Sequence, residues 1–228
     1  MRELLGIKKV EIAFLVVVFF VVFVSGFSSA QGDVAYVYKK EFKIDYNVID
    51  VFENLGFEVD LIHEDDQPSN YNDYEFIFTG DENFDEDIPV NDYPSIVAGS
   101  FHSETWGLTD GDGVSQLGSN TPLSVLVNGD EIQVYTKAFY DGGGTVSIPY
   151  YYLDEENIGN AMEQYAATEE TSSGYKFGDV ISFADIGAKM ENGKTQDGRL
   201  CFFGIIESYY WTDEAEDLFV DCIEFVVG

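Results

Sequence analysis

The chain has 228 residues, of which 43 are acidic and 11 basic, so its formal net charge is −32 at pH 7. Hydrophobic residues make up 45% of it and aromatic residues 16%, which is enough apolar material for a core and excludes a disordered acidic tail. So much negative charge repels phosphate backbones and anionic lipid surfaces. The composition therefore predicts a folded protein that does not bind nucleic acid.

The first thirty residues have the pattern of a secretory signal peptide. Basic residues within 2–9 precede a 13-residue apolar run, 12–24, and small residues at 28–30 supply a cleavage site. This run is shorter than the roughly 17–25 residues that cross a bilayer, so we expect cleavage before Gln31 rather than an uncleaved membrane anchor. The mature chain, 31–228, is then expected to be secreted or at the cell surface, without membrane attachment.

Export leaves the protein strongly acidic. Removal of residues 1–30 leaves 8 basic and 41 acidic residues, a net charge of −33. Self-repulsion of this size destabilises a compact state unless salt screens it. We therefore expect a halophilic or marine archaeal or bacterial source; the alternative is an acidic surface that only keeps the protein soluble. The remaining cations are Lys39, Lys40, Lys43, Lys137, Lys176, Lys189, Lys194 and Arg199.

Apolar runs alternate with a helical pattern in the first part of the mature chain. A strand at 34–38 precedes a helix at 46–55 that stops at Gly56. Further strands are predicted at 57–62, 74–78, 95–98, 180–184 and 200–206, and a last helix begins at 212–214. Strands separated by helices or long crossovers are typical of a parallel sheet covered on both faces. The pattern predicts an α/β flavodoxin-like three-layer sandwich with a mostly parallel sheet.

The middle of the chain, about 107–178, is rich in glycine and in β-type runs. Strands are expected at 123–127, 131–135 and 145–153, with Asn128-Gly129 as a hairpin turn between the first two. A helix is expected at 157–167 and a polar loop at 168–174. We interpret this region as a β-rich insertion within a single domain, 31–228.

Three segments carry a family resemblance. These are DYEFIFTG at 73–80, YPSIVAGSFH at 93–102, and GRLCFFG at 198–204 with the helix that follows it. Their order resembles the class I glutamine amidotransferase-like superfold, and the trehalose-utilisation-type branch is nearest. The resemblance covers about 33–102 and 180–227 and implies a fold more than an activity.

The residues that perform the chemistry of that superfold are missing here. Active members place a cysteine nucleophile on a sharp elbow after an apolar strand and a histidine after the last strand. The matching segments, 98–102 and 206–211, contain no cysteine and no histidine, respectively. Ser100 and His102 are a nucleophile and a base by residue type, but side chains two positions apart on an elbow rarely face one another. The resemblance therefore implies a pseudoenzyme.

Polar and aromatic candidates follow several predicted strands. Ligands of open α/β sheets bind outside the carboxyl ends of the strands. We expect a polar pocket there, with an aromatic wall for a sugar or a peptide; the alternative is solvated loop acids and buried aromatics. The candidate ligand-binding residues are Asp81, Glu82, Asn83, His102, Glu207 and Trp211.

One loop contains half of a calcium-binding pattern. Asp110 and Asp112 stand at alternate positions between glycines, and oxygen ligands so spaced suit a hard cation. The full twelve-residue loop that ends in glutamate is absent. The loop therefore makes Ca²⁺ the one candidate cofactor. The alternative is that the loop is an acidic turn that binds no ion.

The two cysteines are candidates for a disulfide. Cys201 lies in a predicted strand and Cys222 in the last helix, at similar heights if the helix packs back over its strand. Secretion permits a bridge. The alternative is two buried free thiols.

Together these features predict a noncatalytic secreted or cell-envelope binding module whose partner is a glycan or another envelope protein. The alternative is an extracellular hydrolase that acts on a carbohydrate or an amide. Its chemistry would come from the carboxylates or His102 at the strand ends.

Overall fold

The computed structural model describes residues 32–99, 101–111, 114–117, 124–136, 139–141, 144–146, 150–168 and 177–228. The predicted signal peptide, Ser100, Asp112 and most of the predicted polar loop at 168–174 lie outside these residues. Within the described ranges, no helix has the length and apolarity needed to cross a membrane.

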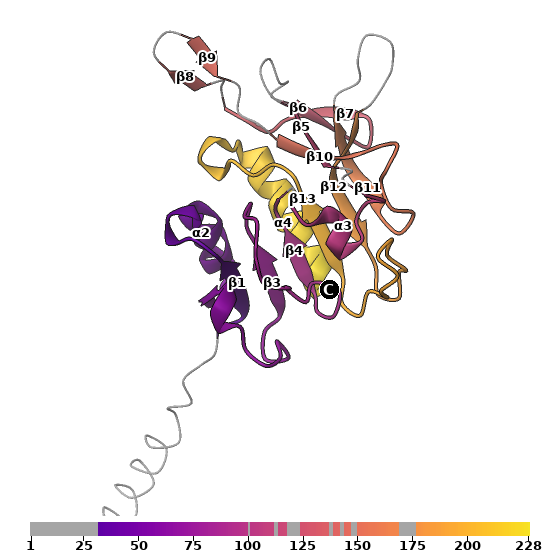
Figure 1. Cartoon of the computed structure of the whole chain (residues 1–228). Helices are drawn as coiled ribbons and strands as arrows, with labels where there is room; N and C mark the ends of the chain where they lie inside the picture. The colour runs from indigo at the N-terminus through magenta and orange to yellow at the C-terminus, as the bar shows by residue number, and fades with distance from the viewer. Residues whose placement is uncertain are drawn as a thin grey trace, which may run out of the picture. The chain divides into compact units, whose positions relative to one another are not determined.

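Five strands form the parallel half of the main sheet (Figure 1). Their order is β2-β1-β3-β4-β13, and each pairs in parallel with its neighbour. Each strand coincides with an apolar run in the sequence. All but the edge strand β2 are almost wholly buried. Their bounds are β1 Val34–Tyr38, β2 Val59–His63, β3 Phe76–Thr79, β4 Ser95–Val97 and β13 Leu200–Phe203.

The same sheet continues beyond β13 as an antiparallel half. Strand β12 (Gly178–Ala184) pairs with β13, and β11 (Glu163–Thr168), β6 (Ser124–Val127) and β7 (Asp130–Gln133) follow in that order. β10 (Tyr150–Asp154) joins β12 to β5 (Val114–Leu117). A separate hairpin consists of β8 (Phe139–Asp141) and β9 (Gly144–Val146).

The prediction of a mostly parallel, flavodoxin-like three-layer sandwich is therefore wrong. The described part of the main sheet has four parallel and six antiparallel pairings. The strands within 107–178 are not an insertion beside a parallel sheet, since several of them extend that sheet from β12 outward. The fold is β-rich, with few helices.

The predicted helix at 157–167 is also wrong. Most of its second half is strand β11, which pairs with β12 on one side and β6 on the other. Glu, Gln and Ala favour a helix locally, but pairing on both edges and burial of Ala166 and Ala167 outweigh that preference. The predicted hairpin turn is present: β6 and β7 are joined by Asn128 and Gly129, whose φ angles are 53° and 89°.

One face of the sheet is covered by two helices, α2 (Tyr46–Asn54) and α4 (Asp213–Val227). Asp45 caps the N-terminus of α2 and Thr212 that of α4. Phe52 of α2 and Phe219 of α4 meet with ring centroids 5.5 Å apart over the Phe78 side chain of β3. An aromatic cluster thus joins both helices to the parallel half.

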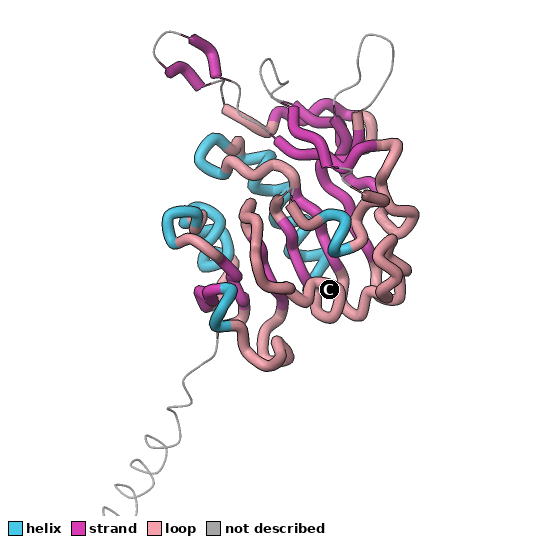
Figure 2. The backbone as a smooth tube through the Cα atoms, viewed as in Figure 1, coloured by secondary structure: helices cyan, strands magenta, loops and turns pink. Residues whose placement is uncertain are grey.

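The opposite face of the sheet is covered mainly by loops (Figure 2). Between β2 and β4 the chain forms only the short 3₁₀-helix η2 (Glu64–Asp66), and α3 (Ser103–Trp106) follows β4. The connections contain Pro68, Pro89 and many Asp and Asn residues, which disfavour helices. Side chains from these loops pack on the sheet where a sandwich would have helices: Tyr71, Phe84, Ile88, Val90, Trp106 and Leu108.

A disulfide joins the sheet to the C-terminal helix. It links Cys201 of β13 to Cys222 of α4, with the two Cα atoms 5.7 Å apart. Both residues are fully buried. The covalent link holds α4 against the middle of the sheet.

Candidate functional site

A cleft of about 360 Å³ opens at the carboxyl ends of the parallel strands. Residues that follow β1, β3, β4 and β13 line it, so the sheet topology brings together segments that are far apart in sequence. We call it the acidic cleft because three carboxylates and one lysine line it together with aromatic side chains. The charged residues are Asp45, Asp81, Glu207 and Lys43, and the aromatic ones include Tyr36, Phe42, Tyr46, Tyr209, Trp211 and Phe219.

Asp81 enters the cleft directly after β3. Its Oδ2 accepts a hydrogen bond from the Tyr151 hydroxyl at 3.3 Å, which fixes the carboxylate at the half-buried wall. Gly99, after β4, lies so close that a Cβ there would be 3.0 Å from the Asp81 Cα. A side chain at position 99 would therefore crowd the Asp81 backbone, and glycine avoids that contact.

Glu207 faces the cleft from the segment after β13. Burial raises the pKa of its carboxyl above the usual range. Lys43 opposes this shift, while the nearby charges of Asp45 and Asp81 add to it. Among the described residues, the groups that act on the Glu207 carboxyl are the nearby charges of Lys43, Asp45 and Asp81, and no side-chain hydrogen bond is among them. Glu207 is thus a half-buried carboxylate whose oxygens are available to a ligand.

The Asp45 carboxylate, in contrast, already has hydrogen-bond partners within the protein. Its Oδ1 accepts from the backbone N–H groups of Asn47 and Val48, at 3.0 and 3.3 Å, and caps helix α2. The Ser208 hydroxyl lies 2.7 Å from both of its carboxylate oxygens. Its backbone N–H donates to the Tyr36 hydroxyl at 2.9 Å. Asp45 therefore holds the α2 N-terminus against the segment that carries Glu207.

Aromatic side chains stand at the mouth of the cleft. Phe42, Tyr46 and Tyr209 are 81%, 63% and 80% exposed. Scattered exposed apolar residues are ordinary, but here three large rings share one cleft with carboxylates. Trp211 lies deeper, where its Nε1 donates to the Ile205 carbonyl at 2.8 Å. The cleft therefore has exposed aromatic surfaces at its mouth and a fixed ring in its wall.

The antiparallel half of the sheet braces the segment that carries Glu207 and Trp211. Tyr135, just after β7, forms a β-bridge with Trp211. The Thr136 N–H donates to the Tyr210 carbonyl at 2.8 Å, and the Thr212 hydroxyl donates to the Gln133 carbonyl at 2.7 Å. The β-rich middle of the chain thus contributes to the site by fixing one of its walls.

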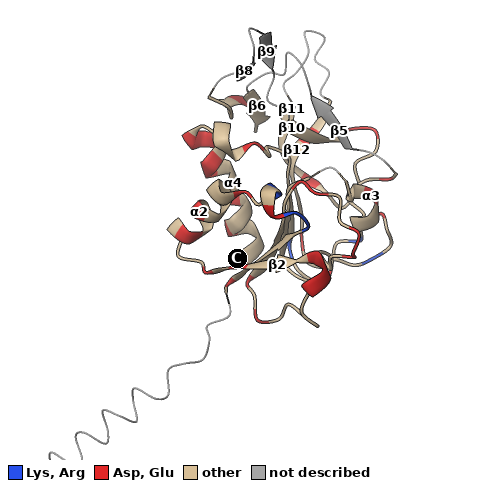
Figure 3. Cartoon of the chain, turned by 60° about the vertical axis from the view of Figure 1, so that its left-hand side comes forward, with Lys and Arg blue, Asp and Glu red and all other residues tan. Residues whose placement is uncertain are grey.

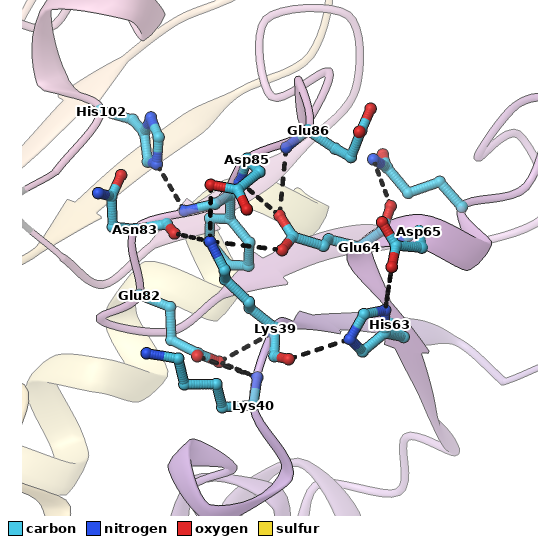
Figure 4. Close-up of polar contacts among 12 residues, drawn as sticks. Lys39, Lys40, His63, Glu64, Asp65, Glu82, Asn83, Asp85, Glu86 and His102 are labelled. Carbon is cyan, nitrogen blue, oxygen red and sulfur yellow. Dashed lines mark hydrogen bonds and ion pairs between the residues drawn. The ribbon is translucent and has the colours of Figure 1, made fainter.

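Three predicted site residues do not line the acidic cleft. The buried Glu82 carboxylate accepts from the backbone N–H groups of Lys39 and Lys40, at 3.0 and 3.1 Å (Figure 4). The Asn83 carbonyl accepts from the Lys39 ammonium at 2.8 Å. His102 Nε2 accepts from the Phe84 N–H at 2.9 Å. The structure thus brings Asp81, Glu207 and Trp211 together, whereas Glu82, Asn83 and His102 hold the loop after β3.

A charge network around the buried Glu64 carboxylate completes this second set. The Glu64 carboxylate is only 4% exposed and accepts from the N–H groups of Asp85 and Glu86, at 2.6 and 3.2 Å. Lys39 Nζ lies 2.8 Å from Asp85 Oδ1 and 3.7 Å from Glu64 Oε1. The buried Glu64 carboxylate has protein partners at both of its oxygens, so we assign the network a structural role.

We expect substitution His102→Ala to destabilise the protein by about 1–3 kcal/mol, because the Phe84 N–H loses its acceptor. Burial lowers the pKa of His102, and the nearby Lys39 charge adds to the effect while Glu64 opposes it. A lowered folded-state pKa contributes stability that is present above about pH 6.5 and is lost as the pH falls. The stability difference between wild type and variant should therefore shrink between about pH 7 and pH 5. Urea unfolding at both pH values measures it.

His102→Asn is the matched control, because its amide oxygen is an acceptor that does not titrate. It should recover part of the stability at neutral pH and show no pH-dependent contribution from this position. A difference between wild type and His102→Ala that is unchanged across this range would contradict the assigned role.

The predicted calcium loop is only partly described. Asp110 lines a shallow surface pocket with Glu104 and Glu191, and the Thr109 hydroxyl closes the loop by donating to the Gly111 carbonyl at 2.8 Å. Asp112 lies outside the described residues. In the part of the chain that the structure describes, no group of three or more His, Cys, Asp or Glu side chains is arranged to hold a metal ion. The Ca²⁺ site stays a prediction from sequence alone.

Sequence reasoning missed several cleft residues. Asp45 carries a usable signal, since an aspartate directly before a predicted helix is an N-cap candidate and follows the first strand of the sheet. Tyr209 and Ser208 follow the last strand, as Glu207 does. Phe42 and Tyr46 carry no such signal, because sequence alone does not show which aromatic side chains stay exposed.

A scan against protein-family models finds no match to this chain, and a search of curated proteins finds none either. The proposals below therefore rest on the geometry and chemistry of the acidic cleft.

Proposed function

We propose that this chain is a noncatalytic, secreted or cell-surface module that binds a glycan in the acidic cleft. The observation that carries the proposal is the combination of carboxylates and exposed aromatic rings in one cleft. Aromatic faces pack on the apolar faces of sugar rings, and carboxylates accept hydrogen bonds from sugar hydroxyls. A volume of about 360 Å³ is at the small end of ligand sites, which favours a short oligosaccharide or the end of a longer one.

Two sequence features support the noncatalytic and extracellular parts of the proposal. The segments 98–102 and 206–211 lack the cysteine and the histidine that active members of the resembled superfold use. The basic, apolar and small-residue pattern of residues 1–30 supports export.

The test is a glycan-binding screen on the mature protein, followed by titration calorimetry. The double substitution Tyr46→Ala and Tyr209→Ala should cost about 2 kcal/mol of binding energy, roughly thirty-fold in Kd, because each ring contributes about 1 kcal/mol. Ile186→Ala is the matched control, since Ile186 is 64% exposed and does not line the cleft. Binding that the double variant leaves unchanged would move the function elsewhere.

One observation favours hydrolysis of a glycan as the second candidate. A carboxyl with a raised pKa, Glu207, shares the cleft with a second carboxylate, Asp81. Such a pair can serve as general acid and as base or nucleophile in glycoside hydrolysis. His102 has no part in this candidate, because it does not line the cleft. Release of reducing ends from a bound glycan that stops in Glu207→Gln would establish hydrolysis in place of binding alone.

A further inference from the structure

We propose that the sugar in the acidic cleft is an amino sugar whose free ammonium group lies against Glu207 and Asp81. This inference rests on the proposed glycan-binding function and names the chemical class of its ligand. The ring of the sugar would pack on the exposed aromatic side chains at the mouth of the cleft.

The first support is the charge of the cleft. Three carboxylates and one lysine line it, so its formal charge is negative. Asp45 uses its carboxylate to cap α2 and to bind Ser208, and the Asp81 carboxylate accepts a hydrogen bond from Tyr151. Among the described residues, no side chain donates a hydrogen bond to the half-buried Glu207 carboxylate. A ligand that enters the cleft therefore meets three carboxylates against one lysine.

The second support is that the N-terminus of α2 is already capped. A helix N-terminus attracts anions through its free N–H groups and its dipole. Here Asp45 already accepts from the N–H groups of Asn47 and Val48, so this end of the helix is closed. The cleft consequently disfavours sulfated, phosphorylated or uronic sugars and favours a cation.

The third support separates an amino sugar from a neutral one. A hydroxyl can donate one hydrogen bond to Glu207 but does not offset the repulsion among the carboxylates. An ammonium group donates stronger, charge-assisted hydrogen bonds and also neutralises that repulsion. Aromatic faces attract ammonium groups as well, and Tyr46 and Tyr209 stand at the mouth of the same cleft.

The experiment compares two ligands that differ only in this group: the disaccharide of β-1,4-linked glucosamine and its N-acetylated counterpart. Titration calorimetry is done at about pH 6, where an amine of this kind is largely protonated, and at moderate salt. We expect the amine form to bind at least about ten-fold more tightly. Glu207→Gln should remove most of this preference.

Glu155→Gln is the matched control. It also removes one negative charge, but Glu155 is exposed and lies outside the cleft, so the preference for the amine should persist. A preference that survives Glu207→Gln would show attraction to the acidic surface in general and would overturn the inference. Equal binding of both disaccharides would overturn the inference and leave the proposed function standing. If neither disaccharide binds, the inference fails, and the proposed function fails with it only if the glycan screen is also empty.

Discussion

Raising the salt concentration from about 0.05 M to about 1 M is expected to raise the thermal unfolding midpoint by on the order of 10 °C. The chain has a net charge of −32, and acidic residues lie along α2, α4 and the connecting loops (Figure 3). At low salt these charges repel one another over distances of about 10 Å or more, whereas molar salt shortens that range to about 3 Å. The unfolded chain spreads the charges apart, so screening favours the folded state.

Salt also weakens favourable ion pairs, but these are few in the described part of the chain. Lys39 pairs with Glu64 and Asp85, and Arg199 pairs with Asp185. Asp85 and Asp185 are exposed, so solvent and salt screen their pairs and these contribute little to stability. Helix α4 shows the repulsion that salt screens, since it carries six acidic residues and no basic residue. The net effect of salt is therefore stabilising.

Calorimetry over a series of NaCl concentrations measures the effect, and a variant tests its cause. Asp217→Asn with Glu224→Gln removes two exposed charges from α4 without touching the core. This variant should melt higher than wild type at low salt and gain less from added salt. An unfolding midpoint that is flat across the series would contradict the halophilic interpretation.

The parallel half of the sheet was predictable because its strands are short apolar runs with clear stops. Most of the antiparallel half was not, because nothing within a strand shows the direction of its neighbour; the exception is the β6–β7 hairpin, where Asn128-Gly129 marks the turn. Strand β11 illustrates this: its helix-favouring residues form a strand only because β12 and β6 lie on either side. The loops on the second face were misjudged for a similar reason, since long crossovers without helical periodicity were expected to be covered by helices.

The site was partly predictable from one rule, that ligands bind at the carboxyl ends of parallel strands. That rule leads to Asp81, Glu207 and Trp211, which the structure brings together in one cleft. It fails for Glu82, which follows Asp81 directly but turns to the backbone N–H groups of Lys39 and Lys40. Adjacent residues in a loop point in different directions, and the partner that fixes each direction is distant in sequence.

Loss of the disulfide is expected to destabilise the protein by about 3 kcal/mol, because the bond closes a loop with a sequence separation of 21. At about 2–4 °C per kcal/mol, the unfolding midpoint of Cys201→Ala with Cys222→Ala should fall by roughly 6–12 °C. Each single substitution removes the same crosslink, so the two effects should not add. Cys222 lies on the helix whose Phe219 also lines the cleft, so affinity for the proposed glycan ligand should weaken as α4 loosens.

Thiol labelling distinguishes a disulfide bond from two buried free cysteines. Unfolded, unreduced wild-type protein should show no reactive thiol, and reduced protein should show two. Two buried free thiols would pack as small apolar side chains, so each alanine substitution would then have its own cost and the costs would add. Additive losses together with two reactive thiols before reduction would therefore contradict a covalent link between β13 and α4.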